Sequence, residues 1–174
     1  ANGRVGNGGS VALTGENVLV QQTGLIQANG GQNGGIIAMT ANDQVYIAGQ
    51  VTALGENGTG GTIDLAGNDI IVAQTGRVDA SGARGGTVTM NANNEIFVAG
   101  EVAARGTNGQ GGVITMNATD IMVAGTGLVD ASGTNGGGTV NITADDTATI
   151  MGRVLATGGD GDGGLINVNA TDVF

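Results

Sequence analysis

The sequence predicts an all-β protein, a right-handed parallel β-helix (β-solenoid) with three short strands in each coil. A Gly-Gly pair returns every 25 or 26 residues along the whole chain. Apolar and polar residues alternate at the same positions after every pair, which is the pattern of a strand with one buried face. A fixed period of this length is typical of solenoids, whereas the turns of an antiparallel sandwich would not return in phase.

The chain is expected to be a single β-helix segment over residues 1–174. About seven coils begin at Gly8, Gly34, Gly60, Gly85, Gly111, Gly137 and Gly163. At the spacing of paired strands, about 4.8 Å, they would form a rod about 32 Å long. Neither end carries a segment that would cover the open strand edges, so we expect the segment to belong to a longer array.

The first strand of each coil follows directly after the Gly-Gly pair. Counting the first Gly as position one, positions four and six are always apolar, and the residues beside them are mostly Thr, Asn, Asp or Ala. One side of such a strand is apolar and is buried only when the coils stack. The residues at position six are Leu13, Met39, Leu65, Met90, Met116, Ile142 and Val168.

Two further strands follow in each coil. The inward residues of the second strand are Val18 and Val20, Val45 and Ile47, Ile70 and Val72, Ile96 and Val98, Ile121 and Val123, and Ala148 and Ile150. The third and shortest strand carries Ile26 and Ala28, Val51 and Ala53, Val78 and Ala80, Val102 and Ala104, Val129 and Ala131, and Val154 and Ala156. A stretch rich in Gly, Asn and Thr then returns the chain to the next Gly-Gly pair.

Successive coils differ in a regular way. The coils that start at Gly8, Gly60 and Gly111 have a longer second corner that contains Thr-Gly. The coils between them turn tightly at Gly49, Gly100 and Gly152, and they recover the length with one extra residue before the second strand. The sequence unit is therefore a double coil of about 51 residues.

The pattern Gly-Gly-x-apolar-x-apolar-x-Ala, then apolar-x-apolar, then Gly-x-Val-x-Ala-x-Gly covers essentially the whole chain. Residues 85–92 (Gly-Gly-Thr-Val-Thr-Met-Asn-Ala) and 125–133 (Gly-Thr-Gly-Leu-Val-Asp-Ala-Ser-Gly) carry it. This pattern resembles the repeat region of filamentous haemagglutinin-like large exoproteins, the adhesins that Gram-negative bacteria export by two-partner secretion. The resemblance implies a secreted or cell-surface rod that holds adhesive domains away from the cell.

The composition excludes most catalytic chemistry and several partners. The chain has no Cys and no His, so thiolate or imidazole metal sites, catalytic triads and Cys nucleophiles are ruled out. Five Arg against fifteen Asp and Glu give a net charge of -10, which disfavours nucleic acid and anionic lipid. No apolar run approaches the roughly 20 residues of a membrane span.

Carboxylates are the remaining candidates for catalysis, because many parallel β-helices degrade polysaccharides with acids on an outer face. Asp64, Asp79 and Asp130 are predicted to point outward from their strands, and no Arg, Lys or His helper is expected beside an asymmetric cleft. Asp79 and Asp130 share one repeat position rather than forming a unique cluster. We therefore expect a protein without catalytic residues or cofactor, and we regard a polysaccharide-acting enzyme as the least favoured alternative.

A polar column at position ten is the candidate for binding a metal ion. Stacked carboxylates about 5 Å apart could hold calcium, a cation that prefers oxygen ligands. The alternative, which we favour, is that these Asp and Asn side chains close turns at a corner. The acidic members of the column are Asp43, Asp69, Asp120, Asp146 and Asp172.

The middle residue of the second strand is expected to point outward, between two inward residues. In five successive coils this residue is large and apolar, so the side chains should stack into a stripe about 25 Å long. Such a stripe either marks an interaction surface or reflects ordinary β-propensity on a solvent-facing sheet. Its members, called here the apolar stripe, are Leu19, Tyr46, Ile71, Phe97 and Met122.

These observations together predict the structural shaft of an extracellular bacterial adhesin or fibre that serves adhesion, biofilm formation or cell-cell contact. The expected partners are other copies or flanking repeats of the same protein and a receptor or glycan on a host or neighbouring cell. The alternative is a self-assembling extracellular filament subunit, in which the stripe and the open ends are assembly contacts.

Overall fold

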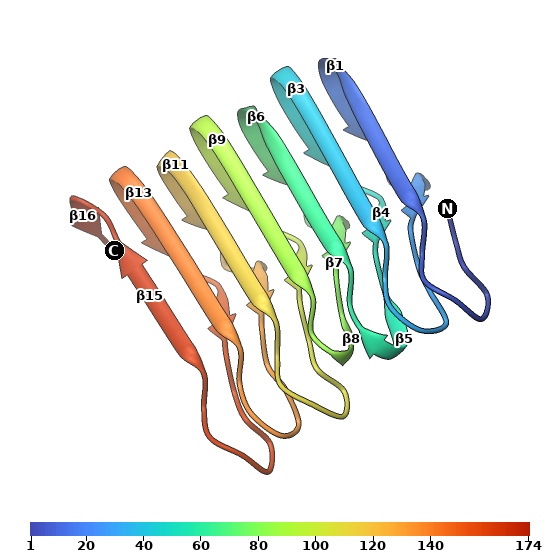
Figure 1. Cartoon of the computed structure of the whole chain (residues 1–174). Helices are drawn as coiled ribbons and strands as arrows, with labels where there is room; N and C mark the ends of the chain where they lie inside the picture. The colour runs from blue at the N-terminus through green and yellow to red at the C-terminus, as the bar shows by residue number, and fades with distance from the viewer.

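The computed structural model describes all residues 1–174 and confirms the parallel β-helix. Every coil runs through one long strand, a corner, a short strand and a projecting loop, and Figure 1 shows the long strands side by side in chain order. All strand pairs are parallel, so each coil pairs with the coil before it and the coil after it. The chain forms no helix, and so none long and apolar enough to cross a bilayer.

The long strands form the main sheet, in the order β1-β3-β6-β9-β11-β13-β15, with β16 paired to the far half of β13. The predicted first and second strands of a coil run together in β1 to β13 and are separated only by a shift in the pairing register, whereas in the last coil they are the separate strands β15 and β16. Their bounds are β1 Ser10–Val20, β3 Ile36–Ile47, β6 Thr62–Val72, β9 Thr87–Val98, β11 Val113–Val123, β13 Thr139–Ile150, β15 Leu165–Asn169 and β16 Asp172–Val173.

The predicted third strands form a second sheet, called here the short sheet, in the order β14-β12-β10-β7-β4-β2. Two more strands, β5 (Gly55–Thr59) and β8 (Gly82–Arg84), pair with each other in the projecting loops. The strands of the short sheet are β2 Leu25–Gln27, β4 Gln50–Thr52, β7 Arg77–Asp79, β10 Glu101–Ala103, β12 Leu128–Asp130 and β14 Arg153–Leu155.

The double-coil period has a structural cause in the main sheet. β3, β9 and β13 have 12 residues, whereas β1, β6 and β11 have 11. The extra residue forms a β-bulge, where one residue of the shorter strand faces two of the longer one. The predicted additional residue before the second strand of alternate coils is thus the bulge.

The interior is one continuous apolar core of 33 buried residues that runs along the whole solenoid. The inward columns named from the sequence fill it; Ile37, Met39, Val51 and Ala53 of one coil, for example, are completely buried. Because every coil offers the same residue types at the same height, the columns interdigitate without large aromatic side chains.

The Gly-Gly pairs lie where neighbouring coils approach most closely. A Cβ on Gly34 would lie 2.3 Å from the amide nitrogen of Gly61 in the coil after, and one on Gly35 would lie 1.9 Å from the carbonyl oxygen of Gly9 in the coil before. The first Gly therefore contacts the following coil and the second contacts the preceding coil. Any side chain at either position would force the coils apart, which explains why the pair returns in every coil.

Candidate functional site: a polar groove beside the short sheet

Each coil sends out a projecting loop, called here an arm, between the short strand and the next Gly-Gly pair. The arm is closed at its base by a hydrogen bond from the second Gly of the pair to the carbonyl of the Ala that follows the short strand, as in Gly35 to Ala28 (2.6 Å) and Gly61 to Ala53 (2.6 Å). Successive arms pair through parallel bridges, such as Gly3 with Gly30 and Gly30 with Gly55. The arms therefore stack into a second layer.

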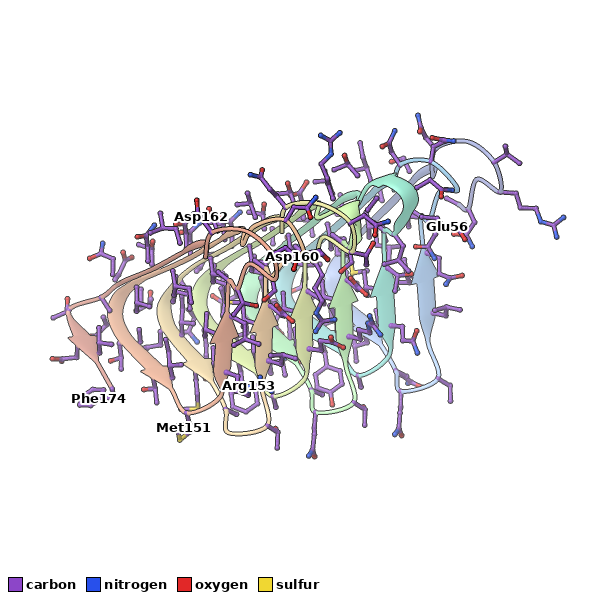
Figure 2. The ribbon with its side chains drawn as sticks, turned by 90° about the horizontal axis from the view of Figure 1, so that it is seen from below. Glu56, Met151, Arg153, Asp160, Asp162 and Phe174 are labelled. Atoms are coloured by element: carbon purple, nitrogen blue, oxygen red, sulfur yellow. The ribbon has the colours of Figure 1, made fainter.

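This layer and the outer face of the short sheet enclose a groove with a volume of about 620 Å³. Figure 2 shows the arms, marked by Asp160 and Asp162, on the opposite side of the solenoid from the corner that carries Met151. Three of the five Arg residues of the chain line the groove. Its side chains are Asn2, Arg4, Asn29, Leu54, Glu56, Arg77, Asp79, Ser81, Arg105 and Thr107.

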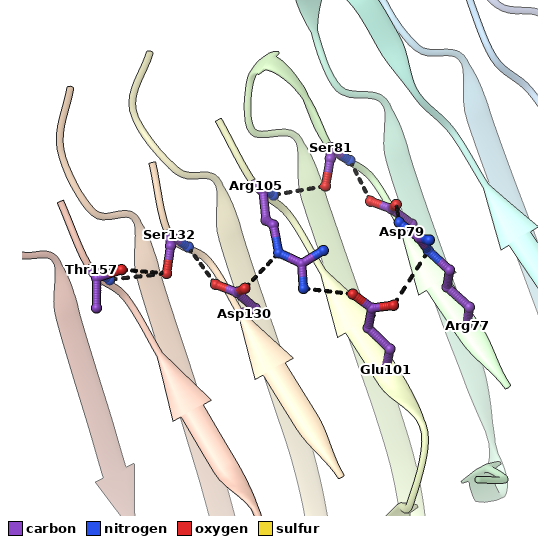
Figure 3. Close-up of polar contacts among 8 residues, drawn as sticks. All are labelled: Arg77, Asp79, Ser81, Glu101, Arg105, Asp130, Ser132 and Thr157. Carbon is purple, nitrogen blue, oxygen red and sulfur yellow. Dashed lines mark hydrogen bonds and ion pairs between the residues drawn. The ribbon is translucent and has the colours of Figure 1, made fainter. Parts of the chain in front are cut away.

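Ion pairs connect three coils along this face, as Figure 3 shows. Arg77 pairs with Asp79 in the same strand, and its Nε lies 3.5 Å from Oε2 of Glu101 in the next coil. Arg105 pairs through Nη2 with Oε1 of Glu101 (2.5 Å) and through Nε with Oδ2 of Asp130 (2.5 Å), one coil further on. The two guanidinium groups thus bridge three carboxylates from three successive coils.

Arg77 and Arg105 line the groove and pair with Asp79 and Asp130, so the expectation that no Arg helper lies beside a cleft is wrong for these two acids. Both follow a buried Val and so point away from the core, but the arms cover them, and only 1% of Asp79 and 6% of Asp130 is exposed. The partner of Asp79 is Arg77, which lies in the same strand. The partner of Asp130 is Arg105, which lies at the base of the arm of the preceding coil. The Arg two residues before Asp79 was a signal in the sequence, because i and i+2 share a strand face.

Backbone amides satisfy the other oxygen of each buried carboxylate. Oδ1 of Asp79 accepts a hydrogen bond from the amide of Ser81 (2.9 Å), and Oδ1 of Asp130 accepts one from Ser132 (2.9 Å). The Ser81 hydroxyl in turn accepts from the amide of Arg105 (2.9 Å) in the next coil. Each Asp thereby holds the base of its arm against the short sheet.

The pKa values of this network follow from its contacts. Burial alone would raise the pKa of Asp130, but hydrogen bonds from Ser132 and Arg105, and the charge of Arg105, hold it below the ordinary 3.8. Burial alone would lower the pKa of Arg105, but hydrogen bonds and attraction to Asp130 and Glu101 raise it above the ordinary value of an Arg side chain. Asp130 is therefore a carboxylate, and Arg105 a cation, at any pH near neutrality.

The acidic column proposed for metal binding divides into two sets in the structure. Asp69, Asp120 and Asp172 share the register of the main sheet, whereas Asp43 and Asp146 lie in bulges beside it. The expectation of one regular column was wrong because the extra residue shifts alternate coils. No group of three or more acidic side chains lies where it could hold a metal ion.

The in-register acids have contacts of their own at the bulges. Oδ1 of Asp69 accepts hydrogen bonds from Asn94 Nδ2 (2.8 Å) and from the amide of Glu95 (3.3 Å). Oδ1 of Asp120 accepts from the amide of Thr147 (3.2 Å). Each carboxylate bonds to a backbone amide at the bulge of the following coil. Calcium binding by these residues stays a prediction.

The apolar stripe occupies a single register column of the main sheet. Pairing joins Leu19 to Tyr46, Tyr46 to Ile71, Ile71 to Phe97 and Phe97 to Met122. Leu19, in the first coil, is 59% exposed, and the other four are half-buried by their neighbours in the column. The in-register column that contains Asp69 and Asp120 runs beside the stripe, two residues earlier along each strand.

The fold and the groove define a β-solenoid with stacked arms, and comparison with known proteins adds no closer identity. No family model, no curated protein and no solved structure matches the chain. The resemblance to haemagglutinin-like exoproteins therefore rests on the repeat pattern alone.

Proposed function

We propose that the protein is a structural shaft segment of an extracellular bacterial adhesin or fibre. The observation that carries this proposal is the unbroken stack: the same parallel register continues from β1 to β15, around one core, without an interruption. A stack of this kind has the geometry of a rod whose length is set by the number of coils. The sequence resemblance to secreted adhesins supports an extracellular location.

Stiffness follows from the direction of the hydrogen bonds. The chain makes 126 backbone hydrogen bonds, and those of the parallel sheets run from coil to coil along the rod axis. Bending the rod would have to stretch these bonds on one side and compress the core on the other. The net charge of -10 keeps such a rod soluble and opposes unspecific association.

We propose that the groove performs no catalysis. A glycoside hydrolase needs one carboxyl that keeps its proton near neutral pH and one that is free to attack or to activate water. Asp79 and Asp130 each have one oxygen on an Arg and the other on a Ser amide, and the pKa of Asp130 is lowered. Neither carboxylate is suited to either role.

A second candidate function is lateral assembly into filaments through the apolar stripe. The stripe supports it because four half-buried and one well-exposed apolar side chains lie in one straight column. A flat apolar column flanked by acids suits contact with an equally flat surface, including that of a second copy.

Electron microscopy of the purified protein and of the native fibre tests the two functions. A shaft predicts thin, straight, solitary rods whose diameter matches one solenoid. Rods that bundle side by side would favour lateral assembly. Flexible, coiled or globular particles would contradict both functions.

A further inference from the structure

We propose that the groove between the short sheet and the arms binds a neutral oligosaccharide chain that lies along the axis of the solenoid. Such binding would give the proposed shaft, on whose adhesive role the inference rests, a ligand-binding surface of its own. The shape of the groove, its walls and its polar groups each point to this class of ligand.

The groove is elongated along the axis. Five successive coils contribute the residue that follows the repeated Ala to the lining, namely Asn2, Asn29, Leu54, Ser81 and Arg105. Hydrogen bonds such as Asn29 amide to Asn2 Oδ1 (2.9 Å) and Leu54 amide to Asn29 Oδ1 (2.8 Å) keep these positions in line. At about 4.8 Å per coil the line is about 19 Å long, so it fits an extended chain rather than a compact molecule.

One wall of the groove is made of glycine backbone. Gly3, Gly30, Gly55 and Gly82 line it, and their amides donate to carbonyl oxygens of the following coil at 2.8 to 3.0 Å. Because these polar groups are already paired, the wall offers flat CH₂ surfaces. The C–H faces of pyranose rings pack well on such a surface. An extended peptide would instead need unpaired backbone groups to add as a strand, and this wall has none to offer at those amides.

The polar groups of the groove suit hydroxyls better than a charged ligand. Arg4, Arg77 and Arg105 alternate with Glu56 and Asp79, and the Glu101 and Asp130 carboxylates already neutralise part of the positive charge. A ligand of one charge sign would meet repulsion as well as attraction. A hydroxyl both donates and accepts, so it can pair with fixed donors and fixed acceptors alike.

Several of these groups are free to bind a ligand. Nδ2 of Asn29 donates to no group of the protein; the groups of Asn29 that are in use are its Oδ1, its backbone amide and its carbonyl. The Glu56 carboxylate is exposed and accepts no hydrogen bond from the chain. Ser81 uses its hydroxyl only as an acceptor, for Arg105. A free donor on Asn29 and a free acceptor on Glu56 therefore lie in neighbouring coils along the groove.

Titration of the intact protein with linear hexamers of glucose, mannose, galactose and N-acetylglucosamine tests the inference, with a galacturonic acid hexamer and an extended peptide as comparisons. We expect saturable binding of at least one neutral hexamer by calorimetry, with NMR shifts of the Asn29 side-chain amide and the Arg105 Nε–H. Absence of binding by every neutral hexamer, or tighter binding of the charged hexamer or the peptide, would overturn it.

A matched pair of variants locates the site. Asn29→Asp keeps the oxygen that accepts from Leu54 but removes the free donor, and we expect binding to weaken about tenfold. Asn7→Asp is the control, because Asn7 Oδ1 accepts from the amide of Asn33 (3.4 Å) in the same manner and its Nδ2 donates to no group of the protein, but it lies outside the groove. Equal losses in both variants, or no loss in Asn29→Asp, would refute the assignment.

Glu56→Ala provides a readout that does not depend on the arm hydrogen bonds, since Glu56 is exposed and has no partner in the chain. It should weaken binding about threefold without changing Tm; unchanged binding would count against the groove as the site. Straight rods that bind no glycan would contradict the glycan-binding groove and would leave the shaft role intact. Glycan binding by a protein that forms no rods would contradict the shaft role and would leave the groove intact.

Discussion

The two outer faces of this solenoid are built on different periods. On the stripe face each of the first five coils supplies an interchangeable apolar side chain, and the column continues from Leu19 to Met122 without a required partner in any of these coils. On the groove face, Asp79 and Asp130 come from alternate coils, and the coil between them supplies Glu101 and Arg105. A repeat of one coil is sufficient to build the apolar stripe, but ion pairs that join neighbouring coils need a repeat of two coils.

This difference predicts that single substitutions cost stability on the groove face and mainly affect association on the stripe face. Asp130→Ala should have the largest effect, because it leaves Arg105 with Glu101 as its one partner and leaves the Ser132 amide without its acceptor. We expect a loss of about 2–4 kcal/mol and a fall in Tm of roughly 5–12 °C in thermal unfolding.

The control for that variant is Asp145→Ala, which removes an exposed carboxylate at a bulge with no hydrogen bond of its own. It should change stability by less than about 0.5 kcal/mol. Equal losses for the two variants would mean that the ion-pair network contributes nothing beyond surface charge.

Acidification should weaken the groove face selectively. The pKa of Asp130 lies below 3.8 in the folded protein, so its stabilisation is complete above that pH and is lost as the pH falls through the folded pKa. The difference in Tm between wild type and Asp130→Asn should therefore shrink as the pH is lowered from 7 to about 2. A difference that stays constant over this range would contradict the lowered pKa.

A smaller effect is expected where the main sheet carries its bulges. Asp69→Ala removes the acceptor for the Glu95 amide and should cost about 1–2 kcal/mol in chemical denaturation. Asp43→Ala changes an exposed acid in a bulge and should be nearly neutral. If Asp43→Ala proved the more costly of the two, the division of the acidic column into two sets would be wrong.

The stripe should respond in association rather than in folding. Changing Tyr46, Ile71 and Phe97 together to Thr should alter stability by less than about 1 kcal/mol per site, because each is only half-buried. Light scattering and electron microscopy should show reduced lateral association of the rods. If the rods of the variant associate as the wild type does, the apolar side chains of the stripe reflect only their β-propensity on a solvent-facing sheet.

The smallest effect is expected from calcium. Asp69 and Asp120 already accept hydrogen bonds from backbone amides, and no three acids converge. Adding calcium should leave Tm unchanged, with no heat in calorimetry. A rise in Tm that Asp69→Ala abolishes would instead establish the cation site predicted from the column.

The sequence was sufficient for the coils because each of their determinants is local. The Gly-Gly pairs and the alternation through Ile37 and Met39 fix strand, direction and burial within a single coil. The groove could not be derived in this way. Asp79 is buried only because an arm folds back over it, and Arg105 reaches Asp130 across a coil boundary; both depend on register between coils rather than on spacing within one.

Because bulged and unbulged coils alternate, such a protein should gain or lose coils two at a time. If recombination between repeats deleted only the coil of Glu101 and Arg105, Asp130 would lose Arg105 and would lie in the coil next to Asp79, with Arg77 left to pair with Asp79. Loss of a double coil would keep the alternation of bulged and unbulged strands. Fibres of this type should therefore evolve, and should be shortened or lengthened by engineering, in units of about 51 residues.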